Sequence, residues 1–403
     1  MSREIGENMN KEKYQQIIEE NQLKTPCYIF DEDELNYRVR KVKGILGLCQ
    51  GELCFAIKAN PFLVPYLDSV LSKYEVCSPG ELEICRNYNI AGEKIVFSGV
   101  VKSYDDIVKA LTYPVGVITI ESMRHWKLLK EAVKATGKKA KVLLRLSSGA
   151  QFGMEKEDIK LILEEQAKIG QIEFEGIHFF TGTQKKGPKY EKEIEHVVEF
   201  MTEIQNQFKI EQMTLEYGPG LAVPYFTADD FEDEFGLVEN MVDYINATNM
   251  PYKLVVELGR YLVASSGAYV TRIVDMKRAE ERKYCMVDGG IHHLNYYGQN
   301  MAMRTPIIEH ISYEKTDAEA EEYMICGSLC TFADILARGY KLTKPEIEDM
   351  LVFKNCGAYS ITEASYLFLS RDMPGIYMYK EGLGIKTIKD AMQTWKINIE
   401  DRK

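Results

Sequence analysis

The segment Phe55-Ala56-Ile57-Lys58-Ala59-Asn60-Pro61 places a lysine after three apolar residues and directly before a turn signal. This pattern is typical of a buried strand that ends at a loop. With its preceding residues it forms the first of eight short apolar runs, at 53–58, 74–77, 95–98, 115–121, 141–147, 173–180, 213–217 and 254–257. Stretches with helical periodicity, such as 104–111 and 125–135, lie between the runs. The alternation predicts a series of β/α units.

Eight such units favour an α/β fold of the closed (β/α)8 TIM-barrel type over a doubly wound sheet. The first run is not followed by a G-x-G-x-x-G fingerprint, which weakens the dinucleotide-binding alternative. After Ala268 the pattern changes to strand-like runs separated by turns, at 268–275, 283–288, 322–325, 351–354 and 375–379. We therefore predict a barrel over residues 27–268 and a mostly-β domain built from residues 1–26 and 269–403, which can also form a dimer surface.

The composition is that of a folded globular protein, with 45% apolar and 28% charged residues among 403. Fifty Lys and Arg against 61 Asp and Glu give a net charge of −11 without long blocks of one sign, so we expect no nucleic-acid partner. No apolar stretch approaches the ~18 residues that span a bilayer, and the first 16 residues are charged rather than signal-like. We expect a soluble, cytoplasmic protein with no membrane partner.

The sequence gives no sign of a metal site. Its nine cysteines form an odd set without a C-x-x-C pair, which favours buried free thiols over a disulfide framework or a zinc site. The neighbouring His292 and His293 are expected on a strand, where adjacent side chains face opposite ways.

Polar and glycine residues follow the predicted strands at the end of a barrel where catalytic groups lie. Lys58 closes the first strand, the seventh strand ends in Tyr217-Gly218-Pro219-Gly220, and the eighth ends in Glu257-Leu258-Gly259-Arg260. A desolvated lysine is a nucleophile toward an aldehyde, and the loops after strands seven and eight commonly bind phosphate. Each motif alone also fits a structural role, as a rim lysine or a glycine turn. Together they indicate an aldehyde cofactor that carries a phosphate, which is pyridoxal 5'-phosphate.

With these motifs the sequence resembles the fold type III pyridoxal-phosphate decarboxylases, the diaminopimelate and ornithine decarboxylase group related to alanine racemase. The resemblance extends over nearly the whole chain. It implies that Lys58 is the Schiff-base lysine of an A-x-K-A-N motif and that Glu257 pairs with the pyridine nitrogen. It also implies a phosphate site that includes Gly218, Gly220, Gly259 and Arg260.

The predicted β domain carries two further motifs of this family. Gly327-Ser328-Leu329-Cys330, followed by Thr331 to Asp334, resembles G-P-x-C-x-x-x-D, and Gly357-Ala358-Tyr359 resembles G-A-Y. The resemblance implies that Cys330 is the general acid, that it reaches the active site of a second subunit, and that the protein is a homodimer with shared active sites. It implies phosphate contacts from Tyr359 and Thr183, and more weakly implies that Arg145 and Glu75 lie near the cofactor. Cys326 is expected to serve packing.

The chain departs from the family pattern in ways that concern the substrate. The strand-six motif H-x-H-x-G-S reads His178-Phe179-Phe180-Thr181-Gly182-Thr183, so Phe180 is expected to stack on the cofactor ring. His178 is expected near the cofactor or as a hydrogen-bonded structural residue. The R-P-x-L-Y and C-E-S segments of diaminopimelate decarboxylases are absent. Asp334 and Arg304 are assigned to the substrate, although Arg304 fits a surface arginine equally well.

The sequence thus predicts a pyridoxal-phosphate amino-acid decarboxylase of the diaminopimelate decarboxylase type. Its D-G-G-x-H-H and C-T-x-x-D motifs resemble the branch that decarboxylates an amino acid tethered to a carrier protein, such as a glutamyl thioester. The substrate is therefore a small amino acid that is either free or carrier-bound. An amino-acid racemase on the same fold, and a non-catalytic single-barrel pyridoxal-phosphate carrier, are the weaker alternatives.

Overall fold

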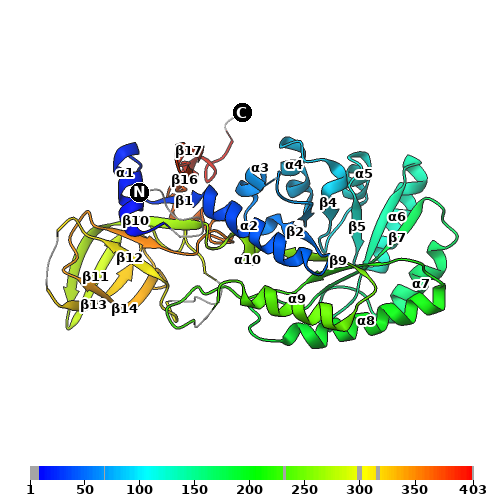
Figure 1. The fold of residues 1–403 in the computed structure, drawn as a ribbon. Helices are drawn as coiled ribbons and strands as arrows, with labels where there is room; N and C mark the ends of the chain where they lie inside the picture. The colour runs from blue at the N-terminus through cyan, green and yellow to red at the C-terminus, as the bar shows by residue number, and fades with distance from the viewer. Residues whose placement is uncertain (1–8, 68, 230–232, 297–301, 315–317, 402–403) are drawn as a thin grey trace. The chain divides into compact units, whose positions relative to one another are not determined.

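The computed structural model describes residues 9–67, 69–229, 233–296, 302–314 and 318–401. The chain divides into two compact units, both visible in Figure 1. The barrel unit comprises Val39–Ala222 and Glu232–Leu262, and the sheet domain comprises Met1–Arg38, Val223–Phe231 and Val263–Lys403. Residues 1–8 of the predicted N-terminal segment lie outside the described part of the chain.

The barrel unit is a closed barrel of eight parallel strands, which confirms the predicted fold class. Its neighbours pair in sequence order, and β2 pairs with β9 to close the ring. Each strand overlaps one of the eight apolar runs: β2 (Glu52–Ala56), β3 (Lys73–Val76), β4 (Ile95–Phe97), β5 (Val117–Ile120), β6 (Ala140–Arg145), β7 (Ile172–Phe180), β8 (Thr214–Gly218) and β9 (Lys253–Leu258).

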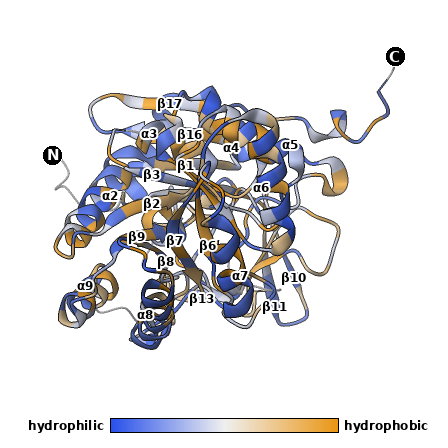
Figure 2. Ribbon diagram, turned by 90° about the vertical axis from the view of Figure 1, so that its right-hand side faces the viewer, coloured by the Kyte–Doolittle hydropathy of each residue, from blue (hydrophilic) through white to orange (hydrophobic). Residues whose placement is uncertain are grey.

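Helices follow the strands and cover the barrel. They are α2 (Glu32–Gly47), α3 (Val64–Leu67), α4 (Pro79–Asn87), α5 (Tyr104–Thr112), α6 (Met123–Thr136), α7 (Lys156–Gln166), α8 (Lys189–Phe208), α9 (Gly236–Thr248) and α10 (Arg260–Val263), with the 3-10 turns η1 (Ile57–Ala59), η2 (Pro61–Leu63) and η3 (Gly92–Lys94). Serine side chains cap three of them: Ser78 accepts from the Glu81 amide, Ser103 forms a capping box with Asp106, and Ser122 accepts from the His125 amide. Figure 2 shows hydrophobic strands inside a layer of helices of mixed hydropathy.

An apolar layer fills the barrel interior below the predicted site. Cys54, Val96, Val117, Leu143 and Val255, one from each of five strands, form a buried cluster. Side chains two residues apart on a strand share a face, so Glu257 lies on the same face of β9 as Val255, one layer nearer the carboxyl end. The polar groups at the carboxyl ends of the barrel strands therefore lie next to a buried apolar layer.

The sheet domain contains a nine-stranded mixed sheet. Its strands are β1 (Cys27–Asp31), β10 (Gly267–Ala279), β11 (Arg282–Val287), β12 (Ile308–Ile311), β13 (Ala320–Cys326), β14 (Ile335–Thr343), β15 (Met350–Phe353), β16 (Gly375–Lys380) and β17 (Gly384–Lys389). Tyr14, Ile17 and Ile18 of α1 (Lys11–Asn21) join the buried apolar cluster on this sheet. Two 3-10 turns, η4 (Phe368–Ser370) and η5 (Thr394–Lys396), complete the domain.

The structure differs from the sequence expectations in three local features. Residues Cys27–Asp31, which fall in the predicted barrel range 27–268 but in none of its eight predicted strands, form β1, which pairs with β10 and β16 of the sheet domain. All five residues of β1 are buried, as they would be in a barrel strand. The apolar pattern of the sequence therefore cannot distinguish a strand of the barrel from a strand of the sheet domain. Lys58 lies in the turn η1 just after β2 rather than within the strand. The pair His292 and His293 lies in a turn with the ring centroids 3.7 Å apart, not on a strand.

In the described part of the chain, no helix is both long enough and apolar enough to cross a membrane.

Candidate active site

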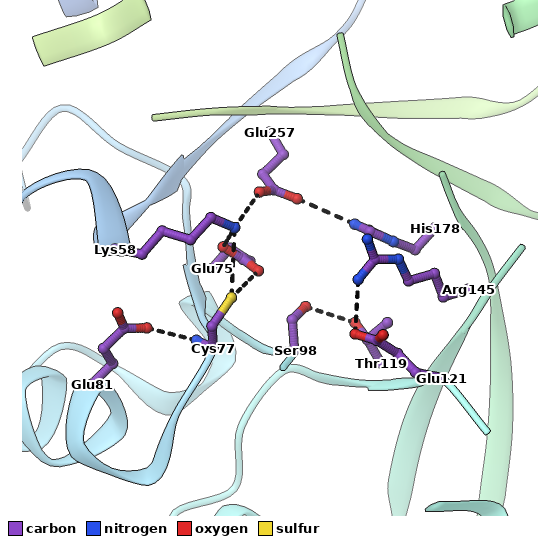
Figure 3. Close-up of polar contacts among 10 residues, drawn as sticks. All are labelled: Lys58, Glu75, Cys77, Glu81, Ser98, Thr119, Glu121, Arg145, His178 and Glu257. Carbon is purple, nitrogen blue, oxygen red and sulfur yellow. Dashed lines mark hydrogen bonds and ion pairs between the residues drawn. The ribbon is translucent and has the colours of Figure 1, made fainter. Parts of the chain in front are cut away.

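Lys58 lies between two glutamates at the carboxyl ends of the barrel strands (Figure 3). Its Nζ is 2.9 Å from Glu75 Oε2 on β3 and 3.1 Å from Glu257 Oε1 on β9. The Cys77 thiol is 3.5 Å from the same nitrogen and donates to Glu75. The lysine side chain is 39% exposed while both glutamates are nearly buried, so the amine remains accessible from the open end.

The pKa values of the two glutamates are shifted in opposite directions. Burial alone would raise the pKa of Glu257, but the Lys58 ammonium and a hydrogen bond from His178 hold that pKa well below its usual range. Burial, followed by the negative charge of Glu257, raises the pKa of Glu75. Glu257 is therefore the carboxylate of this pair that stays ionised, as a group that binds a ring N–H must be.

His178 and Phe180 point to the same side of β7 because they are two residues apart. The His178 Nε2 is 3.2 Å from Glu257 Oε2, while its buried Nδ1 has no partner. His178 is thus hydrogen-bonded and also part of the Lys58 cluster. Phe180 packs over Gly218, where an added Cβ would lie 2.6 Å from a ring carbon of Phe180.

Two glycine turns after β7 and β8 approach each other closely. Gly220 has a φ of +60°, and a Cβ there would lie 1.9 Å from the carbonyl oxygen of Gly182. The Lys185 amide donates to the Gly220 carbonyl at 2.9 Å, which ties the two turns together next to Thr183. Only glycine fits at position 220, because the φ is positive and the backbones of the two turns are in direct contact there.

The Lys185 side chain belongs to a network that sequence reasoning missed. Its Nζ donates to Thr181 and to both oxygens of Glu193, and the Tyr217 hydroxyl also donates to Glu193 at 2.6 Å. Glu193, on α8, therefore fixes the turn that contains Thr183. The spacing of Thr181, Lys185 and Glu193 offered no local signal, because the contacts form only when α8 folds back on the strand.

The carboxyl end of β9 packs against the turn η1, which contains Lys58. A Cβ at Gly259 would be 3.0 Å from the Cβ of Ala59, so this glycine permits the close packing. Arg260 follows at the start of α10 and is 9% exposed. Across the barrel, Arg145 pairs with Glu121 at 2.9 Å and lies over the ring of Phe152.

In the sheet domain, Asp334 organises the loop that carries Cys330. Its Oδ1 accepts from the Ile291 amide at 2.8 Å and its Oδ2 from the Leu329 amide at 2.7 Å. A Cβ at Gly290 or Gly327 would come within 2.7 Å of this carboxylate, which explains both glycines. The Cys330 thiol is exposed, whereas Cys326 is partly buried. Both oxygens of Asp334 are thus engaged by backbone, and its predicted substrate contact stays a prediction.

The other predicted residues of the sheet domain have local partners as well. Arg304 forms an ion pair with Asp229 at 2.5 Å and lies over the ring of Phe226. Tyr359 has a φ of 63° in a turn that follows Gly357, whose amide donates to the Ala264 carbonyl. The structure therefore gathers the barrel residues into one cluster and gathers Cys330 and Asp334 into a second, in the sheet domain.

Two acids of the barrel were underestimated or missed from the sequence. Glu75, expected only weakly near the cofactor, is a direct partner of Lys58. Glu216 was not singled out, although a charged residue at an inward position of a barrel strand is a recognisable signal. His178, Glu216 and Glu257 offer donor atoms within 4.8 Å of one another. Because the Lys58 ammonium already supplies the cation for Glu257, we assign no metal to them.

The residues fit pyridoxal phosphate. Lys58 offers an accessible amine for an aldehyde, and Glu257 offers an ionised carboxylate for a ring N–H. Within the described part of the chain, two buried polar atoms of this cluster, His178 Nδ1 and Glu216 Oε1, have no hydrogen-bond partner.

Comparison with known proteins agrees with this geometry. Residues 32–264 match the family model described as pyridoxal-dependent decarboxylase, pyridoxal binding domain. The chain is 26% identical over 380 residues to L-glutamyl-[BtrI acyl-carrier protein] decarboxylase of Niallia circulans, with 87% of this chain and 88% of that protein covered. It is 27% identical over 371 residues to diaminopimelate decarboxylase of Zymomonas mobilis, with 85% of each covered.

The fold is shared with a solved structure. The crystal structure of diaminopimelate decarboxylase from M. jannaschii with L-lysine superposes with a TM-score of 0.86 at 22% identity, covering 96% of this chain and 94% of that one. The family match spans more than half of the chain and contains the whole Lys58 cluster. The chain therefore belongs to the pyridoxal-dependent decarboxylases and is a pyridoxal-phosphate-dependent carboxy-lyase that acts on an amino acid.

Proposed function

We propose that this protein decarboxylates a free amino acid in the manner of diaminopimelate decarboxylase, with Lys58 as the amine that holds the cofactor and Cys330 as the acid that protonates the product. The observation that carries the proposal is the position of the accessible Lys58 amine between Glu75 and the ionised Glu257, at the mouth of the barrel.

Different residues of the chain would bind the ring and the phosphate of the cofactor. Glu257 would face the ring nitrogen and His178 and Phe180 the ring, with Arg145 nearby. The phosphate would be held by Gly218, Gly220, Thr183, Gly259, Arg260 and Tyr359. When bound, pyridoxal phosphate supplies a sink for the electron pair that departing carbon dioxide leaves on the α-carbon.

The protein's own groups control the protons of the reaction. Glu257, kept ionised by Lys58 and His178, would hold a proton on the ring nitrogen. Cys330 would deliver a proton to the α-carbon of the substrate. Its exposed thiol, on a loop fixed by Asp334, supports its use by a second subunit in a homodimer.

A carrier-bound amino acid is the second candidate. Thr331 and Phe332 stand where diaminopimelate decarboxylases carry the rest of a C-E-S triplet, and Phe332 is 96% exposed. The similarity to a decarboxylase of a glutamyl-carrier protein supports this candidate as well. An apolar side chain in this position suits a tether better than a free ammonium group.

The test is release of carbon dioxide by the purified protein with added pyridoxal phosphate. Free meso-diaminopimelate, ornithine, lysine and glutamate would be compared with a glutamyl thioester on a carrier protein. Turnover of a free diamino acid supports the first candidate, and turnover of the thioester alone supports the second. An amino acid that is inverted with its carboxyl group retained would overturn both in favour of a racemase.

A further inference from the structure

Glu216 is a buried acid of the barrel interior to which the proposed reaction gives no role. It lies on β8 directly opposite His178 of β7 in the strand register, and it is 1% exposed. Its carboxylate lies within 4.8 Å of the donor atoms of His178 and Glu257, and its buried Oε1 has no hydrogen-bond partner among the residues that the structure describes. A carboxyl group in this position is costly unless it is protonated or paired with a cation.

The charges around Glu216 do not balance if every acid is ionised. Glu257 and Glu75 face it as acids, His178 faces it from β7, and the Cys54 thiol lies in the layer below. The cations that act on it are Lys73 and Lys58, and the Lys58 ammonium is already shared by two glutamates. Burial, then the negative charges of Glu257 and Glu75, raise the pKa of Glu216 well above its ordinary value.

We propose that Glu216 is a positioning residue that keeps one proton beside Glu257 in the cofactor-free enzyme and releases it inward when a basic ring nitrogen enters beside Glu257. In this step the O–H bond of Glu216 breaks and its electron pair stays on the carboxylate. The proton passes through the carboxylate of Glu257 to the nitrogen. The new cationic N–H offsets the new charge on Glu216, so the buried cluster gains no net charge.

The inference rests on the proposed place of Glu257 at the ring nitrogen. It goes beyond that proposal because it names the source of the proton. By this inference the proton on the ring nitrogen comes from Glu216 and not from solvent.

The experiment counts protons during loading. Cofactor-free enzyme is titrated with pyridoxal phosphate by calorimetry in buffers of different ionisation enthalpy, at a pH where the free ring nitrogen is mostly unprotonated. The E216Q variant keeps the shape and a hydrogen-bond donor but has no proton to release. We expect E216Q to take up about one more proton from solvent than the wild type. Equal counts in the two proteins would overturn the inference.

Infrared difference spectroscopy provides a second test that does not require E216Q to fold. Loading should remove the C=O band of one protonated carboxylic acid in the wild type and also in Glu75→Gln, which lacks the other acid of the cluster whose pKa is raised. A band that loading leaves unchanged, or that is missing from Glu75→Gln, would contradict the inference. Glu165→Gln is the matched control, because Glu165 lies on the outer surface and pairs with Lys130. Its proton count should equal that of the wild type.

A further variant separates this inference from the proposed function. Glu257→Gln should change the visible absorption of the bound cofactor, because a neutral amide cannot stabilise a cationic ring nitrogen. If that spectrum is unchanged, the proposed place of Glu257 fails, and the inference fails with it. If the E257Q spectrum changes while E216Q matches the wild-type proton count, only the role of Glu216 fails.

Discussion

The barrel cluster around Lys58 and the sheet-domain loop around Cys330 hold their reactive groups by different means. In the barrel, the glutamates are buried and fix Lys58 by charge. In the loop, Asp334 fixes the backbone on both sides and leaves the Cys330 thiol exposed. The comparison shows that a reactive side chain inside one unit can be held in place by ion pairs with its neighbours, as Lys58 is held by Glu75 and Glu257. An exposed reactive side chain is instead positioned by hydrogen bonds that hold the backbone of its loop.

Removing the Lys58 amine should have the largest effect, because it leaves two buried glutamates without their shared cation and removes the group that we propose holds the cofactor. We expect Lys58→Ala to lose at least about 10³-fold in carbon dioxide release and to lose the visible absorption of bound cofactor. Lys141→Ala, on the barrel surface next to Glu175, is the control and should behave as wild type. If the activity of Lys58→Ala is within tenfold of the wild-type activity, Lys58 is not the amine that holds the cofactor.

Cys330→Ala tests the exposed thiol of the sheet-domain loop. We expect turnover to fall by about 10² to 10⁴ while cofactor absorbance and thermal stability stay unchanged, because the thiol contributes no buried contact. Cys326→Ala is matched in chemistry and lies four residues earlier, but it is partly buried and should keep most of its activity. Full turnover in Cys330→Ala, measured under the same conditions, would remove this residue from the mechanism.

Asp334→Asn should separate the rigidity of the loop from its chemistry. An amide can accept only one of the two backbone hydrogen bonds and presents an N–H to the other amide. We expect a loss of about 1 to 3 kcal/mol in the free energy of unfolding, measured by denaturant titration, together with lower turnover. Asp390→Asn, on the exposed surface, should change neither quantity. If stability is unchanged and only the KM for substrate rises, Asp334 contacts the substrate as the sequence suggested.

The smallest effect concerns Lys102, a buried lysine of the barrel, whose Nζ donates to the Gly99 carbonyl. Burial lowers the pKa of Lys102 from 10.5 to about 8. Between these values the unfolded chain binds more protons than the folded chain, so the free energy of unfolding should rise as the pH increases through this range. Lys102→Met should flatten that rise, whereas Lys134→Met on an exposed helix face should preserve it. Equal slopes in wild type and Lys102→Met would show that Lys102 is not desolvated.

Much of the candidate site followed from motifs at strand ends. Lys58, Glu257 and Gly220 lie where their strands end, because a parallel barrel brings all carboxyl ends to one face. The motifs did not predict how much each individual residue contributes to the cluster. Glu75 and Glu216 became partners of the cluster only through barrel closure, and Glu193 only through the return of α8.

The sequence by itself determined the eight-unit barrel, the β domain after it and the order of the cofactor motifs, because strand and helix periodicity and glycine turns are local properties. Tertiary structure alone decided that β1 joins the sheet domain, that one lysine serves two glutamates, and that Asp334 binds backbone amides. These features depend on contacts between residues as far apart as 58 and 257. Burial and charge balance at such contacts arise only when the strands have closed into a barrel.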